Sequence, residues 1–137
     1  MIVVDRTSFE ALVNKEPDSA IQRALDDSDD GMVCMAYETG LEFWLEYVAE
    51  HGIEGLPHLL RCIDQTDLLM LPPSIYHSAA AQAIFKMIGA GHHPTSQLTL
   101  GDCAAYSRAL ASSSYLVCET SKYATAGLPI RPIGELE

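Results

Sequence analysis

The chain has 137 residues, 48% of them hydrophobic, which suffices to bury one core, so we expect a single domain over residues 1–137. No run of about 18 apolar residues occurs, which excludes a transmembrane helix, so we expect no membrane partner. The formal net charge of −11 disfavours nucleic-acid binding through a broad basic face and favours a bound cation or a basic protein partner.

The first segment, Met1-Ile2-Val3-Val4-Asp5, is an apolar run closed by an acid. It is rich in β-branched residues and apolar on both faces, which predicts a buried strand over residues 1–4. It lacks the basic start and the cleavage site of a signal peptide, so we expect a cytoplasmic protein. Similar runs predict strands over residues 32–36, 67–71 and 115–118, and a fifth over residues 128–130, which proline confines to a sheet edge.

Helical patterns separate the strands. They predict helices over residues 9–13, 17–25, 38–50, 56–64, 74–88 and 100–112. In the helix over residues 38–50, a stripe of apolar side chains is expected to face the core, and its members are Leu41, Trp44, Leu45 and Val48. The alternative for part of this surface, at Trp44 and Tyr47, is a groove for a partner.

Several other residue types favour structural roles. Met32, Met35 and Met70 are expected to fill the core. The acidic run over residues 26–31 is expected to be a solvated turn, since the alternative, a calcium-binding loop, needs a later Glu that is absent. The cysteines show no Cys-x-x-Cys spacing, so we expect reduced thiols rather than a zinc site. They are Cys34, Cys62, Cys103 and Cys118.

Strands that alternate with helices predict a three-layer α/β/α fold with a central parallel sheet of four to five strands. In such sheets, binding sites lie at the carboxyl ends of the strands. Asp5 ends the first predicted strand, Glu38 follows the second, and Asp102 lies in the first turn of the helix before the fourth. We therefore expect these three acids to converge at one edge of the sheet.

Two blocks of the sequence resemble the VapC-type PIN domains. The first is the strand ending in Asp5, followed by Thr7-Ser8 and later by Glu16-Pro17. The second and more specific block is Gly91-His92-His93-Pro94 followed by Leu98-Thr99-Leu100-Gly101-Asp102-Cys103-Ala104-Ala105-Tyr106. It is similar to the Gly-x-His-Pro loop and the Leu-x-x-Gly-Asp-Cys-x-Ala-Tyr helix start of that family, and the resemblance runs across essentially the whole chain.

The resemblance implies a PIN-like fold and a metal-dependent endoribonuclease that hydrolyses RNA, with Mg²⁺ or Mn²⁺ as cofactor. Such proteins are usually homodimeric toxins of toxin–antitoxin pairs, which implies a basic, VapB-like antitoxin as partner. The resemblance assigns catalytic and metal-binding roles to Asp5, Glu38 and Asp102, and a supporting role to Thr7 beside the first Asp.

The chain departs from the family at positions close to these acids. Arg6 stands where the family has Thr or Ser, and Ser121 and Lys122 stand where it has acids that supply a fourth ligand. Glu119 can replace that ligand, with Ser121 in support, or an Arg6 or Lys122 cation can pair with the acids and displace the metal. The alternative function is a catalytically impaired PIN-like binding or regulatory module that lacks the fourth metal-binding acid. Apart from the resemblance, Asp5 can be a helix cap, and Glu38 and Asp102 can be first-turn acids.

Overall fold

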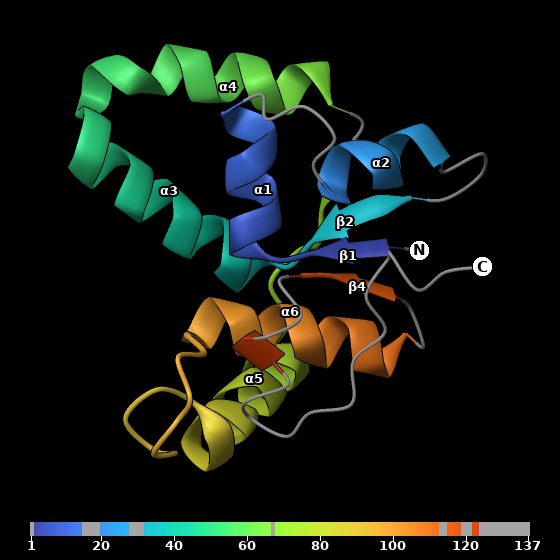
Figure 1. The fold of residues 1–137 in the computed structure, drawn as a ribbon, viewed down its shortest axis with the longest axis vertical. Helices are drawn as coiled ribbons and strands as arrows, with labels where there is room; N and C mark the ends of the chain where they lie inside the picture. The colour runs from blue at the N-terminus through green and yellow to red at the C-terminus, as the bar shows by residue number, and fades with distance from the viewer. Residues whose placement is uncertain are drawn as a thin grey trace.

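The computed structural model describes residues 2–14, 20–27, 32–66, 68–112, 115–118 and 122–123 (Figure 1). Within them, four short strands form one parallel sheet in the order β3-β2-β1-β4. The strands are β1 (Ile2–Val4), β2 (Val33–Met35), β3 (Leu68–Met70) and β4 (Tyr115–Val117). The predicted mixed α/β class with a parallel sheet is confirmed, and the strand predicted over residues 128–130 lies outside the described residues.

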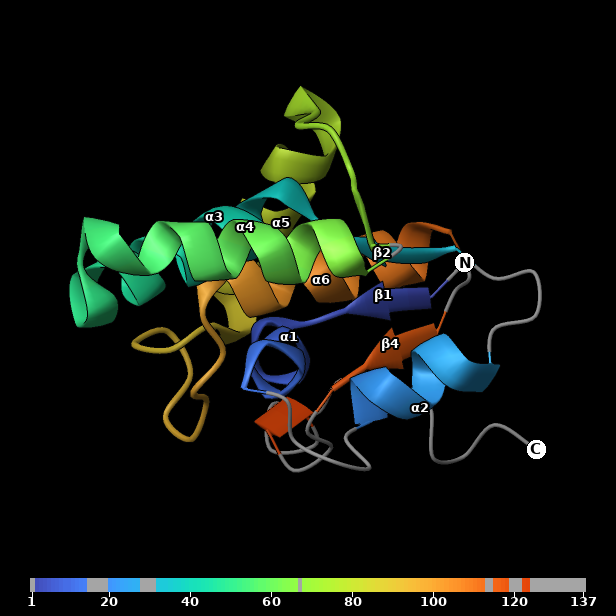
Figure 2. The ribbon, with the colours of Figure 1, turned by 90° about the horizontal axis from the view of Figure 1, so that it is seen from above.

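Helices cover both faces of this sheet. In Figure 1, α1, α2 and α4 lie above it and α5 and α6 below it, while Figure 2 shows β2, β1 and β4 side by side. The helices are α1 (Arg6–Val13), α2 (Ala20–Asp27), α3 (Tyr37–His51), α4 (Leu56–Gln65), α5 (Ile75–Ile88) and α6 (Leu100–Ala111), and a 3₁₀ turn, η1 (Ile53–Gly55), precedes α4. No helix in the described part of the chain is long and apolar enough to cross a membrane.

Successive strand residues face two separate cores. Val4 of β1 and Val117 of β4 pack with Phe9 of α1 and with residues of α3 and α4. Their neighbours, Val3 and Leu116, pack on the opposite face against residues of α6. This two-residue period is what a strand buried on both faces requires, because successive side chains point to opposite sides of a sheet.

Helix α3 buries a different face from the one predicted. Thr39 and Phe43 are buried, whereas Leu41 is 45% and Leu45 62% exposed. The neighbours of α3 give the reason: the Phe43 ring packs edge-on against Phe9, with the ring centroids 4.9 Å apart, and the Thr39 hydroxyl donates a hydrogen bond to the backbone of α6. The predicted apolar stripe of α3 was therefore wrong for Leu41 and Leu45.

The predicted methionine core is correct only in part. Met35 is buried, but Met32 is 55% and Met70 38% exposed. Met70 lies on β3, which is an edge strand, and Met32 precedes β2, so neither occupies the middle of the sheet. The four cysteines are unpaired, and three of them are buried, as expected for free thiols in the core.

Phe43→Ala is expected to lower the free energy of unfolding by about 3–5 kcal/mol, because it leaves a cavity against Phe9. Leu45→Ala, on the exposed face of the same helix, is the matched control and is expected to change it by less than about 0.5 kcal/mol. Urea denaturation of both variants and the wild type measures the difference. Similar losses in the two variants would contradict the buried face assigned to α3.

Candidate functional site

Asp5 lies where β1 ends and α1 begins, and its side chain is fully buried. Its Oδ1 accepts a hydrogen bond from the backbone N–H of Ser8 at 2.9 Å, and its Oδ2 accepts one from the Tyr123 hydroxyl at 3.1 Å. The Ser8 hydroxyl donates in turn to the Val117 carbonyl of β4 at 3.0 Å. Asp5 is therefore the N-cap of α1, and its carboxylate is held at the carboxyl edge of the sheet.

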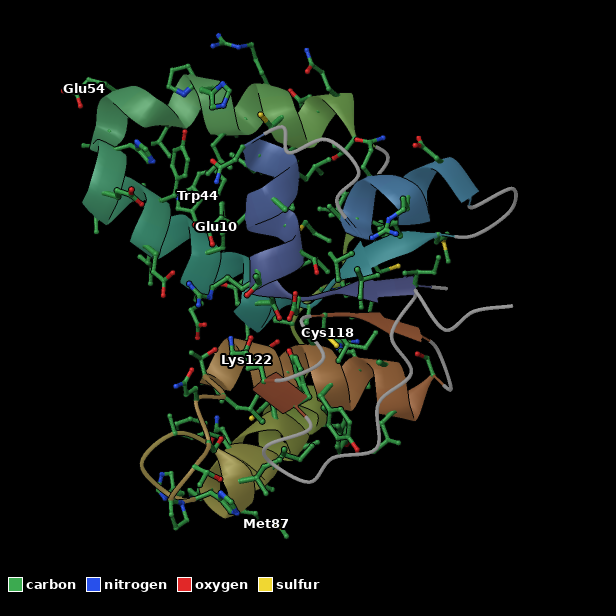
Figure 3. The ribbon with its side chains drawn as sticks, viewed as in Figure 1. Glu10, Trp44, Glu54, Met87, Cys118 and Lys122 are labelled. Carbon is green, nitrogen blue, oxygen red and sulfur yellow. The ribbon has the colours of Figure 1, made fainter. Side chains whose placement is uncertain are left out.

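Asp102 lies in the first turn of α6 and is also fully buried. It forms a capping box with Thr99: its Oδ2 accepts a hydrogen bond from the Thr99 N–H at 2.9 Å, and its own N–H donates to the Thr99 hydroxyl at 3.2 Å. The same Oδ2 lies 2.6 Å from Nζ of Lys122, whose side chain is 12% exposed. Figure 3 shows Lys122 at this end of α6.

Tyr123 links the two acids. Its hydroxyl oxygen lies 3.1 Å from Asp5 Oδ2 and 3.5 Å from Asp102 Oδ1, and the residue is fully buried. A phenol has one hydrogen and so donates to one carboxylate at a time. The structure thus brings Asp5 and Asp102 together around one hydroxyl group. Tyr123 is a site residue that the sequence did not single out, because no local pattern marks it.

The structure places Glu42, rather than the predicted Glu38, against the start of α6. Glu42 Oε1 accepts a hydrogen bond from the Thr99 hydroxyl at 2.5 Å, and Oε2 accepts one from the Gly101 N–H at 3.0 Å. A Cβ on Gly101 would lie 3.0 Å from the Glu42 carboxyl carbon, so the glycine allows this close approach. Glu38, one turn earlier on α3, accepts a hydrogen bond from the Ser78 hydroxyl of α5 instead.

Arg6 pairs with acids of α3. Its guanidinium contacts the Glu46 carboxylate, and its Nε lies 3.7 Å from Glu42 Oε1. That Nε is buried and makes no hydrogen bond among the described residues. Of the two cations predicted to interfere with the acids, Lys122 therefore contacts Asp102 directly, whereas Arg6 neutralises the neighbouring carboxylates of α3.

The other predicted supporting residues have different outcomes. The residue that contacts Asp5 at the start of α1 is Ser8, one position after the predicted Thr7. Glu119 and Ser121 lie outside the described residues. Burial raises the pKa of the Cys103 and Cys118 thiols to about 12, and nearby acids add to this, so both thiols are protonated and poor nucleophiles at neutral pH.

Burial controls the protonation of Asp5. It raises the pKa of the Asp5 carboxyl above its ordinary value, and the nearby Asp102 charge acts in the same direction, while hydrogen bonds at the α1 cap oppose the shift. Burial and the two carboxylates also raise the pKa of Tyr123 well above its ordinary value. The Tyr123 hydroxyl therefore keeps its hydrogen and remains a donor to the acids.

The donor set of this site suits a hard cation. Among the described residues, no group of three or more His, Cys, Asp or Glu side chains is arranged to hold a metal ion. The buried acid pair nevertheless holds a positive charge, since the Lys122 ammonium lies 2.6 Å from Asp102 Oδ2. Carboxylate oxygens are the preferred ligands of Mg²⁺ and Mn²⁺, so the side chains of Asp5 and Asp102 have the chemistry that such an ion needs.

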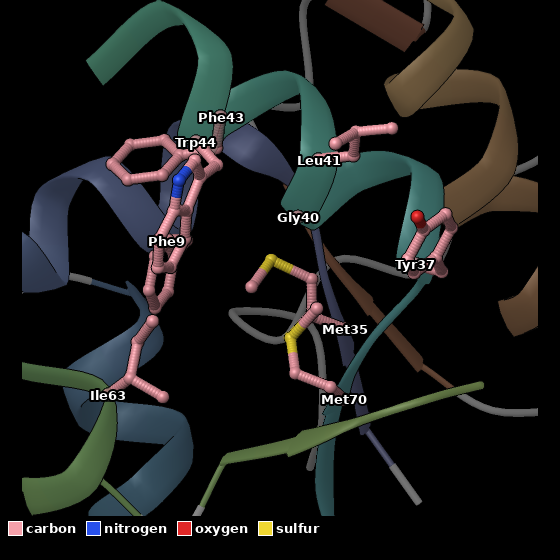
Figure 4. A pocket seen from close by; sticks show the side chains of 9 residues that line it. All are labelled: Phe9, Met35, Tyr37, Gly40, Leu41, Phe43, Trp44, Ile63 and Met70. Carbon is pink, nitrogen blue, oxygen red and sulfur yellow. The ribbon is translucent and has the colours of Figure 1, made fainter. Parts of the chain in front are cut away.

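An apolar cavity of about 270 Å³ lies apart from the acids (Figure 4). Its walls come from α1, α3 and α4 on one side and from two strand methionines on the other, namely Phe9, Phe43, Trp44, Ile63, Met35 and Met70. Trp44, for which both a core and a partner groove were predicted, lines this cavity and is only partly buried.

Comparison of the chain with protein-family models and with curated proteins gave no match in either case.

Asp5→Asn is expected to gain stability relative to the wild type as pH rises. Because the pKa of Asp5 is raised in the folded state, its contribution to stability is present at low pH and is lost as pH rises through the folded pKa. Asn carries no charge and escapes that loss, while Asp102, Lys122 and Tyr123 are common to both proteins.

Urea denaturation from about pH 4, near the ordinary pKa of an aspartate, to about pH 8, in buffer with a metal chelator, measures this difference in unfolding free energy. Asp64→Asn, which changes an exposed acid of α4, is the matched control. A difference for Asp5→Asn that stays constant with pH would contradict the raised pKa.

Proposed function

We propose that the chain is a PIN-like endoribonuclease of the VapC toxin type, which hydrolyses RNA phosphodiester bonds with Mg²⁺ or Mn²⁺. The observation that carries the proposal is the pair of fully buried carboxylates, Asp5 and Asp102, gathered around the Tyr123 hydroxyl at the carboxyl end of a parallel sheet. Ligands of open α/β sheets bind at this end. Buried acids that face one another are uncommon away from functional sites, because their charges repel.

In this proposal, Asp5 and Asp102 hold the divalent ion. When bound, the ion supplies positive charge that stabilises the transition state at the scissile phosphate and acidifies the attacking water. The protein orients its two ligands beforehand: the Ser8 N–H and the Tyr123 hydroxyl fix Asp5, and the Thr99 N–H fixes Asp102. Such supporting hydrogen bonds tune metal ligands in proteins generally.

Glu42 is the third acid of the proposed site. The Thr99 hydroxyl and the Gly101 N–H each donate a hydrogen bond to one oxygen of the Glu42 carboxylate. These contacts hold Glu42, a residue of α3, against the first turn of α6, which also carries Asp102. This role replaces the one that the family resemblance suggested for Glu38, whose carboxylate accepts a hydrogen bond from Ser78. In this proposal Glu42 supports the Asp102 ligand through the start of α6, and Asp5 and Asp102 hold the ion.

The partner in this proposal is a basic, VapB-like antitoxin segment with an apolar face. The apolar cavity beside Trp44 would take apolar side chains. A smaller polar pocket between α1 and α3 carries three acids that would take basic ones, namely Glu10, Glu46 and Glu50. A homodimer, usual in the family that the sequence resembles, is part of the same proposal.

A second candidate function is supported by the Lys122 contact. An ammonium 2.6 Å from Asp102 neutralises part of the acid pair without a metal. If it stays there permanently, the chain is a catalytically impaired PIN-like binding or regulatory module. RNA cleavage and metal binding separate the two candidates.

Asp102→Asn is expected to reduce Mn²⁺-dependent RNA cleavage by more than about a hundredfold, beyond the loss usual for outer-shell partners. Asn can retain the hydrogen bond with Thr99, so the loss reflects the missing charge rather than the missing cap. Cleavage of labelled RNA by purified protein in Mg²⁺, Mn²⁺ or chelator measures the effect, with Asp64→Asn as the control. Cleavage that survives in Asp102→Asn, or that the wild type lacks in every metal, would rule out the ribonuclease proposal.

Glu42→Gln is expected to reduce RNA cleavage at least about tenfold more than Glu38→Gln, because only Glu42 contacts the start of α6. Glu54→Gln, at an exposed acid just beyond the end of α3, is the control for a general effect of negative charge. The three variants are compared in one cleavage assay with Mn²⁺ in excess. A larger loss in Glu38→Gln would return the third acid to the position suggested by the family resemblance.

A further inference from the structure

A positively charged side chain of the protein, that of Lys122, contacts the acid pair directly. Lys122 Nζ lies 2.6 Å from Asp102 Oδ2, with the Asp102 side chain fully buried and the Lys122 side chain 12% exposed. The ion pair is therefore shielded from water. In such a buried environment the Coulomb attraction between two charges is stronger than at a surface. Lys122 lies beside the start of α6 (Figure 3), and it immediately precedes Tyr123, whose hydroxyl contacts both acids.

This contact has an energetic reason. A buried carboxylate without a cation is costly, and Asp102 has a second carboxylate, that of Asp5, on the other side of Tyr123. One added positive charge relieves both the burial of Asp102 and its repulsion from Asp5. An ammonium and a divalent ion relieve this charge in the same way, so they compete for the same oxygen atoms.

Arg6, the other nearby cation, also attracts Asp102 through its charge, but its direct contacts are with acids of α3. Its guanidinium is held by Glu46 and lies beside Glu42. A lysine is also better suited to a reversible contact, since its ammonium is a point charge on a flexible four-carbon stem rather than a planar fork fixed by two partners.

We infer that Lys122 is a built-in competitor of the metal and sets the metal affinity of the site. Its ammonium neutralises Asp102 in the metal-free protein, and a divalent ion binds the acid pair only when the Lys122 side chain leaves Asp102. The inference deepens the proposed function and rests on it for the identity of the competing ion. Metal binding should therefore be weak in the wild type and coupled to exposure of Lys122.

The first test measures the reactivity of lysines in the wild-type protein. Amine acetylation followed by mass spectrometry compares Lys122 with Lys86, an exposed residue of α5. In chelator, Lys122 is expected to react at least about tenfold more slowly than Lys86, because its nitrogen is buried against Asp102 and is poorly accessible to the reagent. Excess Mn²⁺ is expected to raise the reactivity of Lys122 and leave that of Lys86 unchanged.

The second test measures Mn²⁺ binding by calorimetry. Lys122→Gln is expected to bind Mn²⁺ at least about tenfold more tightly than the wild type, Lys122→Arg no more tightly, and the control Lys86→Gln with unchanged affinity. Thermal unfolding should show Lys122→Gln less stable than the wild type in chelator and recovered by Mn²⁺, because the ion restores the missing positive charge.

Several results would overturn the inference. Lys122 would react as fast as Lys86 in chelator, or Lys122→Gln would bind Mn²⁺ no more tightly than the wild type, or neither protein would bind it. The labelling experiment uses only the wild type, so it decides the question even if Lys122→Gln does not fold. Absence of RNA cleavage in proteins that do bind Mn²⁺ would count against the proposed ribonuclease alone, since competition between Lys122 and the ion is read from binding and labelling.

Discussion

The burial of two carboxylates side by side is the constraint on which the rest of this site depends. Asp5 and Asp102 are both inaccessible to water, and each lies within reach of the Tyr123 hydroxyl. Like charges in a medium of low polarity repel strongly, so the surrounding groups must compensate. They do so with backbone N–H groups at two helix starts, with one phenol, and with the Lys122 ammonium. The pKa of Asp5 remains raised, mainly because the carboxyl is buried and to a smaller extent because of the Asp102 charge.

The same acids also hold the fold together. Asp5 caps α1, and Asp102 forms a capping box with Thr99 at the start of α6, so each carboxylate satisfies backbone donors that would otherwise be unpaired. A structural role and a role in binding are therefore not alternatives for these residues. Because helix starts carry partial positive charge, placing acids there lowers the cost of burying them, which makes a helix start at the sheet edge a suitable position for a cation-binding carboxylate.

The acidic charge of the chain is distributed unevenly around the site. Helix α3 carries an acid at every fourth position, and Arg6 pairs with two of them, Glu42 and Glu46. Lys122 pairs with Asp102. These two cations leave the site partly neutralised by the protein itself, which reconciles a net charge of −11 with a compact, buried acid cluster. In the proposed function, the strength of these ion pairs sets the affinity of the acids for a divalent ion, and so whether the metal site is active or impaired.

The sequence by itself determined the alternation of strands and helices and the positions of Asp5 and Asp102, because both depend on local patterns: an apolar run closed by an acid, and a capping sequence before a helix. Only the tertiary structure decided which acid of α3 joins them and which face of that helix is buried. Glu38 and Glu42 differ by about one helical turn and are equivalent in any local pattern, so the choice depends on where α6 crosses α3. Tyr123 lies 118 positions from Asp5 in the sequence, and no local signal links residues so far apart. Their contact exists because parallel strands β1 and β4 are neighbours in the sheet and end at the same edge.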